Sequence, residues 1–186
     1  MLLAIDTSSQ YASVALHDGT RVLGEHSWLA GFEHSRSLLP NIRTLLDQAG
    51  VTAQQVTAVV VALGPGSFNG LRVGLSTAKG LAIGLGIPLV GVPTLDLVRA
   101  EYGTADLGLN AGRGRIYQLR PDGSIETVPG ELPERIHHAG VLAELGNQRL
   151  QAGDTLDLAT AQPLYVQPPR ITPSARHPLP QGANAA

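Results

Sequence analysis

The sequence contains no cysteine, few aromatic residues and few charges. The absence of cysteine excludes a disulfide scaffold, a zinc site with cysteine ligands and a thiol nucleophile. Only 15% of the residues are charged and the net charge is -2, so the chain lacks the basic surface that neutralises nucleic-acid phosphates. Aromatic residues make up 4%, too few for a platform on which bases stack. Direct nucleic-acid binding is therefore not expected.

Long hydrophobic runs are also missing. No apolar run approaches the roughly 18 residues of a membrane span, and the N-terminus MLLAIDTSSQ has neither the basic region nor the cleavage site of a signal peptide. What the chain does have is a hydrophobic fraction of 43% in 186 residues, enough to bury the core of one domain or two small lobes. We expect a globular, cytoplasmic protein that does not bind membranes.

The hydrophobic pattern of the first hundred residues predicts alternating strands and helices. A continuous apolar run at 58–63 is typical of a parallel strand with both faces covered. Period-two and helical spacings predict the other elements. The expected strands are 2–6, 11–18, 21–29, 58–63 and 87–92, and the expected helices are 34–49, 71–85 and 94–102. This order predicts an α/β fold with a mixed sheet flanked by helices.

The rest of the chain is less regular. Two strands are expected within 106–119, around a turn at Gly112, Arg113 and Gly114, with a third strand at 124–128 and a short helix at 137–145. The last stretch, 168–186, contains five prolines and is expected to be a poorly ordered tail. The predicted organisation is an N-terminal lobe (1–100), a shortened second lobe (101–167) and a proline-rich tail (168–186).

A glycine-rich segment, GPGSFNG at 64–70, separates the apolar run from the following helix. Such a turn lets backbone N–H groups and a helix N-terminus face an anion. The spacing matches neither the Walker loop nor the dinucleotide fingerprint. Two interpretations stay open: contact with a phosphate, or a tight turn in which Ser67 or Asn69 caps the helix.

Asp6, at the end of the first strand, is a second candidate. Beside Thr7, its carboxylate is placed to hold a metal-bound phosphate at the carboxyl edge of the sheet, or simply to cap the turn. No G-x-S-x-G or H-E-x-x-H pattern is present, and the six histidines are scattered or adjacent. His34 is expected to be a capping or surface residue. We predict no resident metal and no catalytic residue.

The helix predicted at 71–85 is apolar nearly all round, with Arg72 and Lys79 as its only charges. Gly74, Ala78 and Ala82 form a small-residue stripe that permits close approach of another helix. A helix of this kind must be covered on both sides. Either the helix at 34–49 covers it within the chain, or a second chain does so.

Three segments together resemble the TsaB (YeaZ) family of tRNA threonylcarbamoyladenosine biosynthesis proteins: IDTSSQYASVAL, HSRSLLPNI and GPGSFNGLRVGLSTAKGLA. The later LNAGRGRIY and PLYVQPPRIT are similar more loosely. The resemblance implies an actin-like, sugar-kinase-like ATPase (ribonuclease H-like) fold with two related lobes. Two departures are Asn69, where the family usually has Thr, and a shorter chain after residue 100, which implies a trimmed second lobe.

The resemblance also implies a function. The family's role is that of a non-catalytic partner for the TsaD-type subunit, which transfers threonylcarbamoyl to an adenosine next to the tRNA anticodon. A TsaE-type ATPase is the further partner, tRNA is contacted only through the complex, and the chain alone is expected to form a homodimer. No cofactor is implied beyond weak ATP or ADP binding.

By the same resemblance, two groups of residues carry these roles. The remnant of the nucleotide fold is expected at Asp6, Thr7, Gly64, Gly66, Ser67 and Gly70. The partner interface is expected on the two helices, at Leu38, Ile42, Leu45, Arg72, Leu75, Ala78, Lys79 and Ala82. With Arg72 and Lys79 at its rim and Ala78 in its centre, Ala78→Glu is expected to abolish partner binding while leaving the monomer folded.

Other functions remain open at this stage. The main alternative is a nucleotide-binding ATPase or phosphotransferase of the actin-like superfamily that uses Asp6 as a metal ligand and the loop 64–70 for phosphate. A homodimeric scaffold for a different partner is another. A metallopeptidase is disfavoured, because no set of metal ligands is present.

Overall fold

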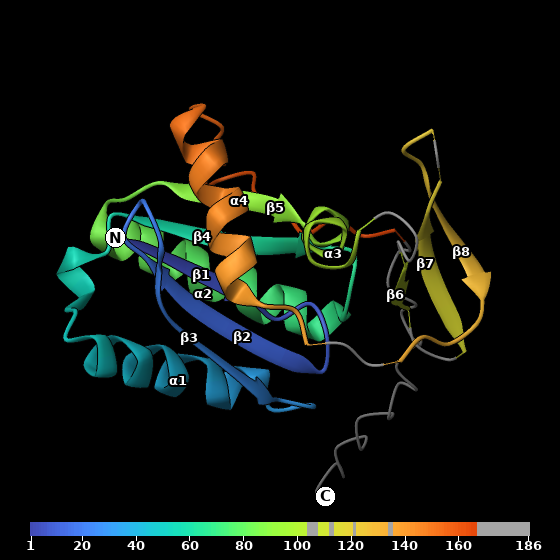
Figure 1. Ribbon diagram of the computed structural model, residues 1–186, viewed down its shortest axis with the longest axis horizontal. Coiled ribbons are helices and arrows are strands. Elements are labelled where there is room, and N and C mark those ends of the chain that lie inside the picture. Colours follow the sequence, from blue (N-terminus) through green and yellow to red (C-terminus); the bar gives the residue numbers. More distant parts are fainter. Residues whose placement is uncertain (104–107, 112–113, 121, 134–135, 167–186) are drawn as a thin grey trace, which may run out of the picture.

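The computed structural model describes residues 1–103, 108–111, 114–120, 122–133 and 136–166 (Figure 1). Its centre is a five-stranded mixed sheet with the strand order β3-β2-β1-β4-β5. The middle strand β1 pairs antiparallel with β2 and parallel with β4. The strands are β1 (Leu2–Asp6), β2 (Tyr11–His17), β3 (Val22–Leu29), β4 (Ala58–Gly64) and β5 (Leu89–Pro93). All five were predicted, with boundaries within two residues.

Helices cover both faces of this sheet (Figure 1). On one face, α1 (His34–Ala49) and α2 (Phe68–Leu85) pack on Leu3 and Ile5 of β1. On the other, α3 (Thr94–Tyr102) and α4 (Ala139–Gln151) pack on Leu2 and Ala4. Every residue of β4 is buried, because this strand has neighbours on both sides and helices on both faces. The mixed sheet flanked by helices is as predicted.

A second, three-stranded antiparallel sheet lies beside α3. Its strands are β6 (Gly108–Asn110), β7 (Arg115–Leu119) and β8 (Ile125–Pro129). Leu109 and Tyr117 of this sheet pack on Leu95 and Val98 of α3, which joins the small sheet to the main body. The expected strands are therefore present, while Gly112 and Arg113 of the predicted turn lie outside the described residues.

Helix α4 is longer than the predicted helix at 137–145, and it packs on the five-stranded sheet. Gly146 permits this contact, because a Cβ there would overlap with the side chain of Val60 in β4. A segment from the predicted second lobe thus completes the far face of the first one. The chain then returns along the sheet, where Leu164 N donates to the carbonyl of Leu63 at 2.8 Å.

Helix α1 contains a proline and ends at a glycine. Pro40 lies inside α1, which continues to Ala49, and Gly50 follows in the left-handed conformation that is typical of a helix C-terminus. A short 3-10 turn (Ala53–Gln55) leads into β4. No helix in the described part of the chain is both long and apolar enough to cross a bilayer. The tail predicted at 168–186 lies outside the described residues.

Candidate functional site

The loop 64–70 packs against the turn that follows β1. Ser67 N donates to the carbonyl of Ser8 at 2.6 Å, and Thr7 Oγ1 donates to the carbonyl of Gly70 at 2.8 Å. Ser67 Oγ accepts from Gly70 N at 3.2 Å and so caps α2, one of the two roles predicted for it. The structure thus brings together Asp6, Thr7, Gly66, Ser67 and Gly70. Gly64 lies at the other end of the loop, where its N–H donates to Thr94 Oγ1.

The glycines of this loop are needed for contact within the chain. A Cβ added at Gly66 would overlap with the carbonyl of Ser8, and one at Gly70 would overlap with the carbonyl of Thr7. One helical turn later, a Cβ at Gly74 would overlap with the Thr7 hydroxyl. The Thr7–Ser8 backbone therefore lies directly against the loop that would otherwise face a phosphate.

Asp6 is buried, with 2% of its surface exposed. Its Oδ1 accepts from Ser8 N at 2.7 Å, and its Oδ2 lies 3.2 Å from Nδ1 of His137, which is also buried. Within the described residues, no group of three His, Asp or Glu side chains is placed to hold a metal ion. Both carboxylate oxygens thus have a partner within the chain, and the buried Asp6 side chain is not presented to solvent.

His137 was not identified from the sequence. Its partner Asp6 is 131 positions away, and a histidine just before a helix gives no local sign of such a contact. Ser8 Oγ also lies 3.4 Å from His137, but at the same Nδ1 atom that faces Asp6. A Ser-His-Asp relay requires the two partners on different ring nitrogens, so this cluster is not a nucleophilic triad.

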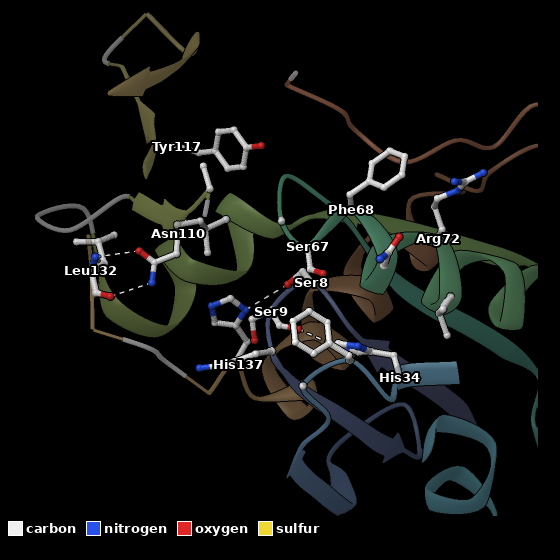
Figure 2. A pocket seen from close by; sticks show the side chains of 18 of the residues that line it. Ser8, Ser9, His34, Ser67, Phe68, Arg72, Asn110, Tyr117, Leu132 and His137 are labelled. Atoms are coloured by element: carbon white, nitrogen blue, oxygen red, sulfur yellow. Dashed lines mark hydrogen bonds between the residues drawn. The ribbon is translucent and has the colours of Figure 1, made fainter. Parts of the chain in front are cut away.

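A cavity of about 700 Å³ opens beside the loop 64–70. Figure 2 shows Tyr117 on one side of it and Phe68 and Arg72 on the other, with Ser8 and His137 between them. Burial raises the pKa of Tyr117 above its ordinary value of 10.0, so its phenol stays neutral. The cavity lies between the β1–β2 turn, the first turns of α1 and α2, and the small sheet.

The walls of the cavity are held by hydrogen bonds. Asn110 donates to the carbonyl of Leu132 at 2.8 Å and accepts from Leu132 N at the same distance (Figure 2). His34 Nε2 donates to the carbonyl of Ser9 at 2.9 Å, and only 4% of the His34 surface is exposed. The prediction of His34 as a capping or surface residue is therefore wrong: it is a buried link between α1 and the β1–β2 turn.

Most of the predicted interface residues lie in the interior of the chain. The apolar ones are at most 4% exposed and pack between α1, α2 and the sheet: Leu38, Ile42, Leu45, Leu75, Ala78 and Ala82. Their prediction as partner contacts is wrong, because α1 lies beside α2 and both helices pack their apolar sides inward. Lys79 is engaged as well, since its Nζ donates to the carbonyl of Ala161 at 3.3 Å.

The opposite side of α2 remains exposed, and we call it the outer face. Ile83 on this face is 64% exposed, and a Cβ at Gly80 or Gly84 would meet nothing within 4 Å. Arg72 is its only charge and lies over the Phe68 ring, 5.1 Å from its centroid. The outer face consists of Arg72, Val73, Ser76, Gly80, Ile83 and Gly84. Of the predicted interface residues, only Arg72 belongs to it.

The matches of this chain to a family model and to individual known proteins agree with one another. Residues 24–165 match the sequence model of TsaD, tRNA N6-adenosine threonylcarbamoyltransferase. The chain is 41% identical over 95 residues to the tRNA threonylcarbamoyladenosine biosynthesis protein TsaB of Escherichia coli, a match that covers 50% of this chain and 40% of that protein. It is 36% identical over 121 residues to TsaB of Bacillus subtilis, which covers 62% of this chain and 52% of that protein. The chain thus spans about half the length of these relatives.

The solved structure of YeaZ from Pseudomonas aeruginosa superposes with a TM-score of 0.72 at 27% identity. The match covers 89% of this chain and 99% of that one. Together with the sheet order and the flanking helices, it confirms the predicted actin-like (ribonuclease H-like) α/β fold.

Proposed function

Because the chain belongs to the tRNA N6-adenosine threonylcarbamoyltransferase (TsaD) family, and within it to the TsaB (YeaZ) proteins, we propose that it serves tRNA threonylcarbamoyladenosine biosynthesis as a non-catalytic partner. The transfer of threonylcarbamoyl to tRNA is carried out by a TsaD-type subunit in the cytoplasm. The present chain docks on that subunit and supports it. It meets tRNA only through the complex, in keeping with its net charge of -2.

The close packing of the loop 64–70 on Thr7 and Ser8 is the observation that carries the non-catalytic assignment. The resemblance to actin-like ATPases implies that Asp6, at the end of β1, and the glycine loop are remnants of a nucleotide site. Here the carboxylate of Asp6 is bound by Ser8 N and His137, and the glycines of the loop lie against Thr7 and Ser8. The groups that would bind a metal-nucleotide instead stabilise the fold.

The outer face of α2 is the proposed docking surface for the TsaD-type subunit. It offers an exposed isoleucine, two glycines that let another backbone approach closely, and a single charge. Leu39 on the neighbouring helix α1 is also 54% exposed. The match of this chain to the TsaD family model supports pairing between two subunits of the same fold. The same face joins two copies when the chain is alone, and a TsaE-type ATPase is the further partner.

Size-exclusion chromatography with light scattering tests this proposal. The chain alone is expected to be a homodimer that converts to a mixed complex when its cognate TsaD-type subunit is added. Ile83→Glu, which places a charge on the outer face, is expected to abolish the mixed complex. Gln151→Glu is the matched control, since it adds the same charge at an exposed position of α4, on the other side of the sheet. A mixed complex formed equally well by Ile83→Glu would contradict the docking surface.

The alternative of a self-sufficient ATPase is tested separately. We expect the isolated chain to hydrolyse no ATP in the presence of magnesium. Hydrolysis by the wild-type chain that disappears in Asp6→Asn, with the fold retained by circular dichroism, would establish the alternative. The choice of Asn keeps the size of the buried side chain and an oxygen that can accept from Ser8 N.

A further inference from the structure

After α4 the chain returns across the first lobe as an irregular segment, 156–166, which we call the strap. Leu156 N donates to the carbonyl of Leu89 in the edge strand β5 at 2.8 Å. Leu164 N donates to the carbonyl of Leu63 in β4 at the same distance. The side chain of Leu156 also packs on the core that α1 and α2 share with the sheet. The strap is therefore fixed to the sheet at two separate points.

Two glycines leave room for the strap. A Cβ added at Gly64 would lie 2.9 Å from the carbonyl oxygen of Leu164, and one added at Gly91 in β5 would lie 2.8 Å from the side chain of Leu156. Gly64 also has a φ of 108°, a conformation that other residues rarely adopt. The first glycine of the segment GPGSFNG therefore serves the passage of the strap, in addition to the turn into α2.

The strap runs antiparallel to α2 along one side of the helix. Lys79 Nζ donates to the carbonyl of Ala161, and nearer the start of α2 the ring of Phe68 packs on Tyr165. Residues four positions apart are neighbours on the surface of a helix. Each of these two helix positions is therefore followed, one turn later, by a member of the outer face.

The outer face of α2 and the strap thus form one continuous surface. Its members Arg72 and Ile83 lie next to the two strap contacts, and Leu164 and Tyr165 of the strap are themselves 42% and 40% exposed. Exposed apolar side chains that gather in this way are typical of a protein interaction site. The exposed surface beside α1 and α2 is therefore wider than the helices alone.

Three stacked side chains stand where the strap meets the outer face. The ring centroids of Tyr165 and Phe68 are 5.1 Å apart with a tilt of 35°, and the Arg72 guanidinium lies 5.1 Å from the centroid of the Phe68 ring. Tyrosine and arginine are the side chains that most often dominate the energy of a protein interface. Because the stack already orders these side chains, less conformational entropy is lost when a partner covers them.

We propose that the strap belongs to the docking surface for the TsaD-type subunit and that Tyr165 is an anchor of this contact, an inference that rests on the proposed function. The partner is the same for both parts of the surface, because a subunit that covers Arg72 and Ile83 also reaches the side chains beside them. The partner packs an apolar side chain on the exposed side of the Tyr165 ring. It also supplies a carboxylate to Arg72, which makes no ion pair with a described carboxylate.

Calorimetric titration of the full chain with its cognate TsaD-type subunit tests this proposal, with the melting temperature of each sample as the measure of folding. Tyr165→Ala is expected to weaken the affinity at least about tenfold, and Tyr165→Phe, which keeps the ring, by less than about twofold. Tyr102→Ala is the matched control, because Tyr102 is also 40% exposed but lies on α3, on the other side of the sheet. Leu164→Glu leaves the stack intact and tests the same surface independently, with an expected loss of at least about tenfold.

Wild-type affinity in folded Tyr165→Ala and Leu164→Glu would overturn the role of the strap, as would equal losses in Tyr165→Ala and the control Tyr102→Ala. A loss in Tyr165→Phe as large as that in Tyr165→Ala would exclude the ring as the anchor. Ile83→Glu separates this inference from the proposed function. If Ile83→Glu abolishes the complex while the strap variants bind normally, the strap alone is excluded. If the wild-type chain does not bind the TsaD-type subunit, the proposed function fails, and the role of the strap fails with it.

Discussion

The two faces of helix α2 are built from similar residues but lie in opposite environments. The inner face carries Leu75, Ala78 and Ala82, which are buried against α1 and the sheet. The outer face carries Gly80, Ile83 and Gly84, which are exposed. A helix that is small and apolar all round therefore does not reveal which side a neighbour already covers. The position of α1 decides this, and it assigns the stripe of Gly74, Ala78 and Ala82 to the interior.

The glycines on the two faces have different explanations. Gly74 on the inner face lies against the Thr7 hydroxyl, so a larger residue does not fit. Gly80 and Gly84 on the outer face touch nothing that would exclude a side chain. Glycine within a helix costs about 0.5–1 kcal/mol relative to alanine. No contact among the described residues offsets this cost at Gly80 and Gly84, which supports the proposed contact of the outer face with another protein.

Ala78→Glu is expected to have the largest effect on the inner face. The added carboxylate would lie in the apolar core without a partner, which destabilises a protein by about 3–5 kcal/mol. We therefore expect the variant to be unfolded or aggregated at 25 °C, as circular dichroism and urea titration would show. This replaces the expectation from sequence that Ala78→Glu keeps its fold. A folded monomer of near wild-type stability would contradict the inner-face assignment.

Alanine at two glycines compares the faces directly. Gly74→Ala is expected to destabilise the protein by about 1–3 kcal/mol, because the new methyl group overlaps with Thr7. Gly80→Ala has open space and is expected to stabilise it by about 0.5–1 kcal/mol. Urea denaturation of both variants in parallel measures the difference. Changes of the same sign in the free energy of unfolding of the two variants would contradict the distinction between the inner and outer faces.

Thr7→Val sharpens the comparison from the side of the β1–β2 turn. The substitution keeps the shape of the side chain but removes the hydrogen bond from Thr7 Oγ1 to the Gly70 carbonyl. Loss of a buried hydrogen bond is expected to cost about 1–2 kcal/mol. Denaturation midpoints measure this cost, and Thr77→Val, on α2 itself, serves as the matched control. An equal effect of the two substitutions would argue against tight packing of the turn on α2.

Lys79→Met is expected to have the smallest effect. It removes the contact between Lys79 Nζ and the Ala161 carbonyl while keeping the aliphatic stem, at a cost of about 0.5–1 kcal/mol. Because Lys79 contacts its own chain, we expect the affinity for the TsaD-type subunit to change by less than about twofold. A large loss of affinity, measured by calorimetry, would show instead that Lys79 contributes to the interface with the TsaD-type subunit.

The sequence was sufficient for the fold because its signals are local. The continuous apolar run at 58–63 and the helical periodicity of 34–49 can each be read from residues that are close in sequence. The observed strand β4 and helix α1 agree with these two signals. The glycine-rich loop was also found, but the sequence left open whether Ser67 or Asn69 caps the following helix, and the structure shows that Ser67 does.

The site was harder to predict because its key contacts join distant segments. The pairing of Asp6 with His137 depends on where the segment before α4 crosses the sheet, and nothing in the local sequence encodes this. The wrong interface residues have a similar origin, since the spacing of Ala78 and Ala82 is the same whether the covering helix belongs to this chain or to another one.

The affinity of Gly80→Glu for the cognate TsaD-type subunit, measured by calorimetry together with the melting temperature of the same sample, tests the central claim most directly. Glutamate replaces a helical glycine that has open space around it, so the melting temperature should equal or exceed that of the wild type. The account predicts that binding is lost while the fold is retained. Wild-type affinity in this folded variant would contradict the assignment of the outer face of α2 as the docking surface.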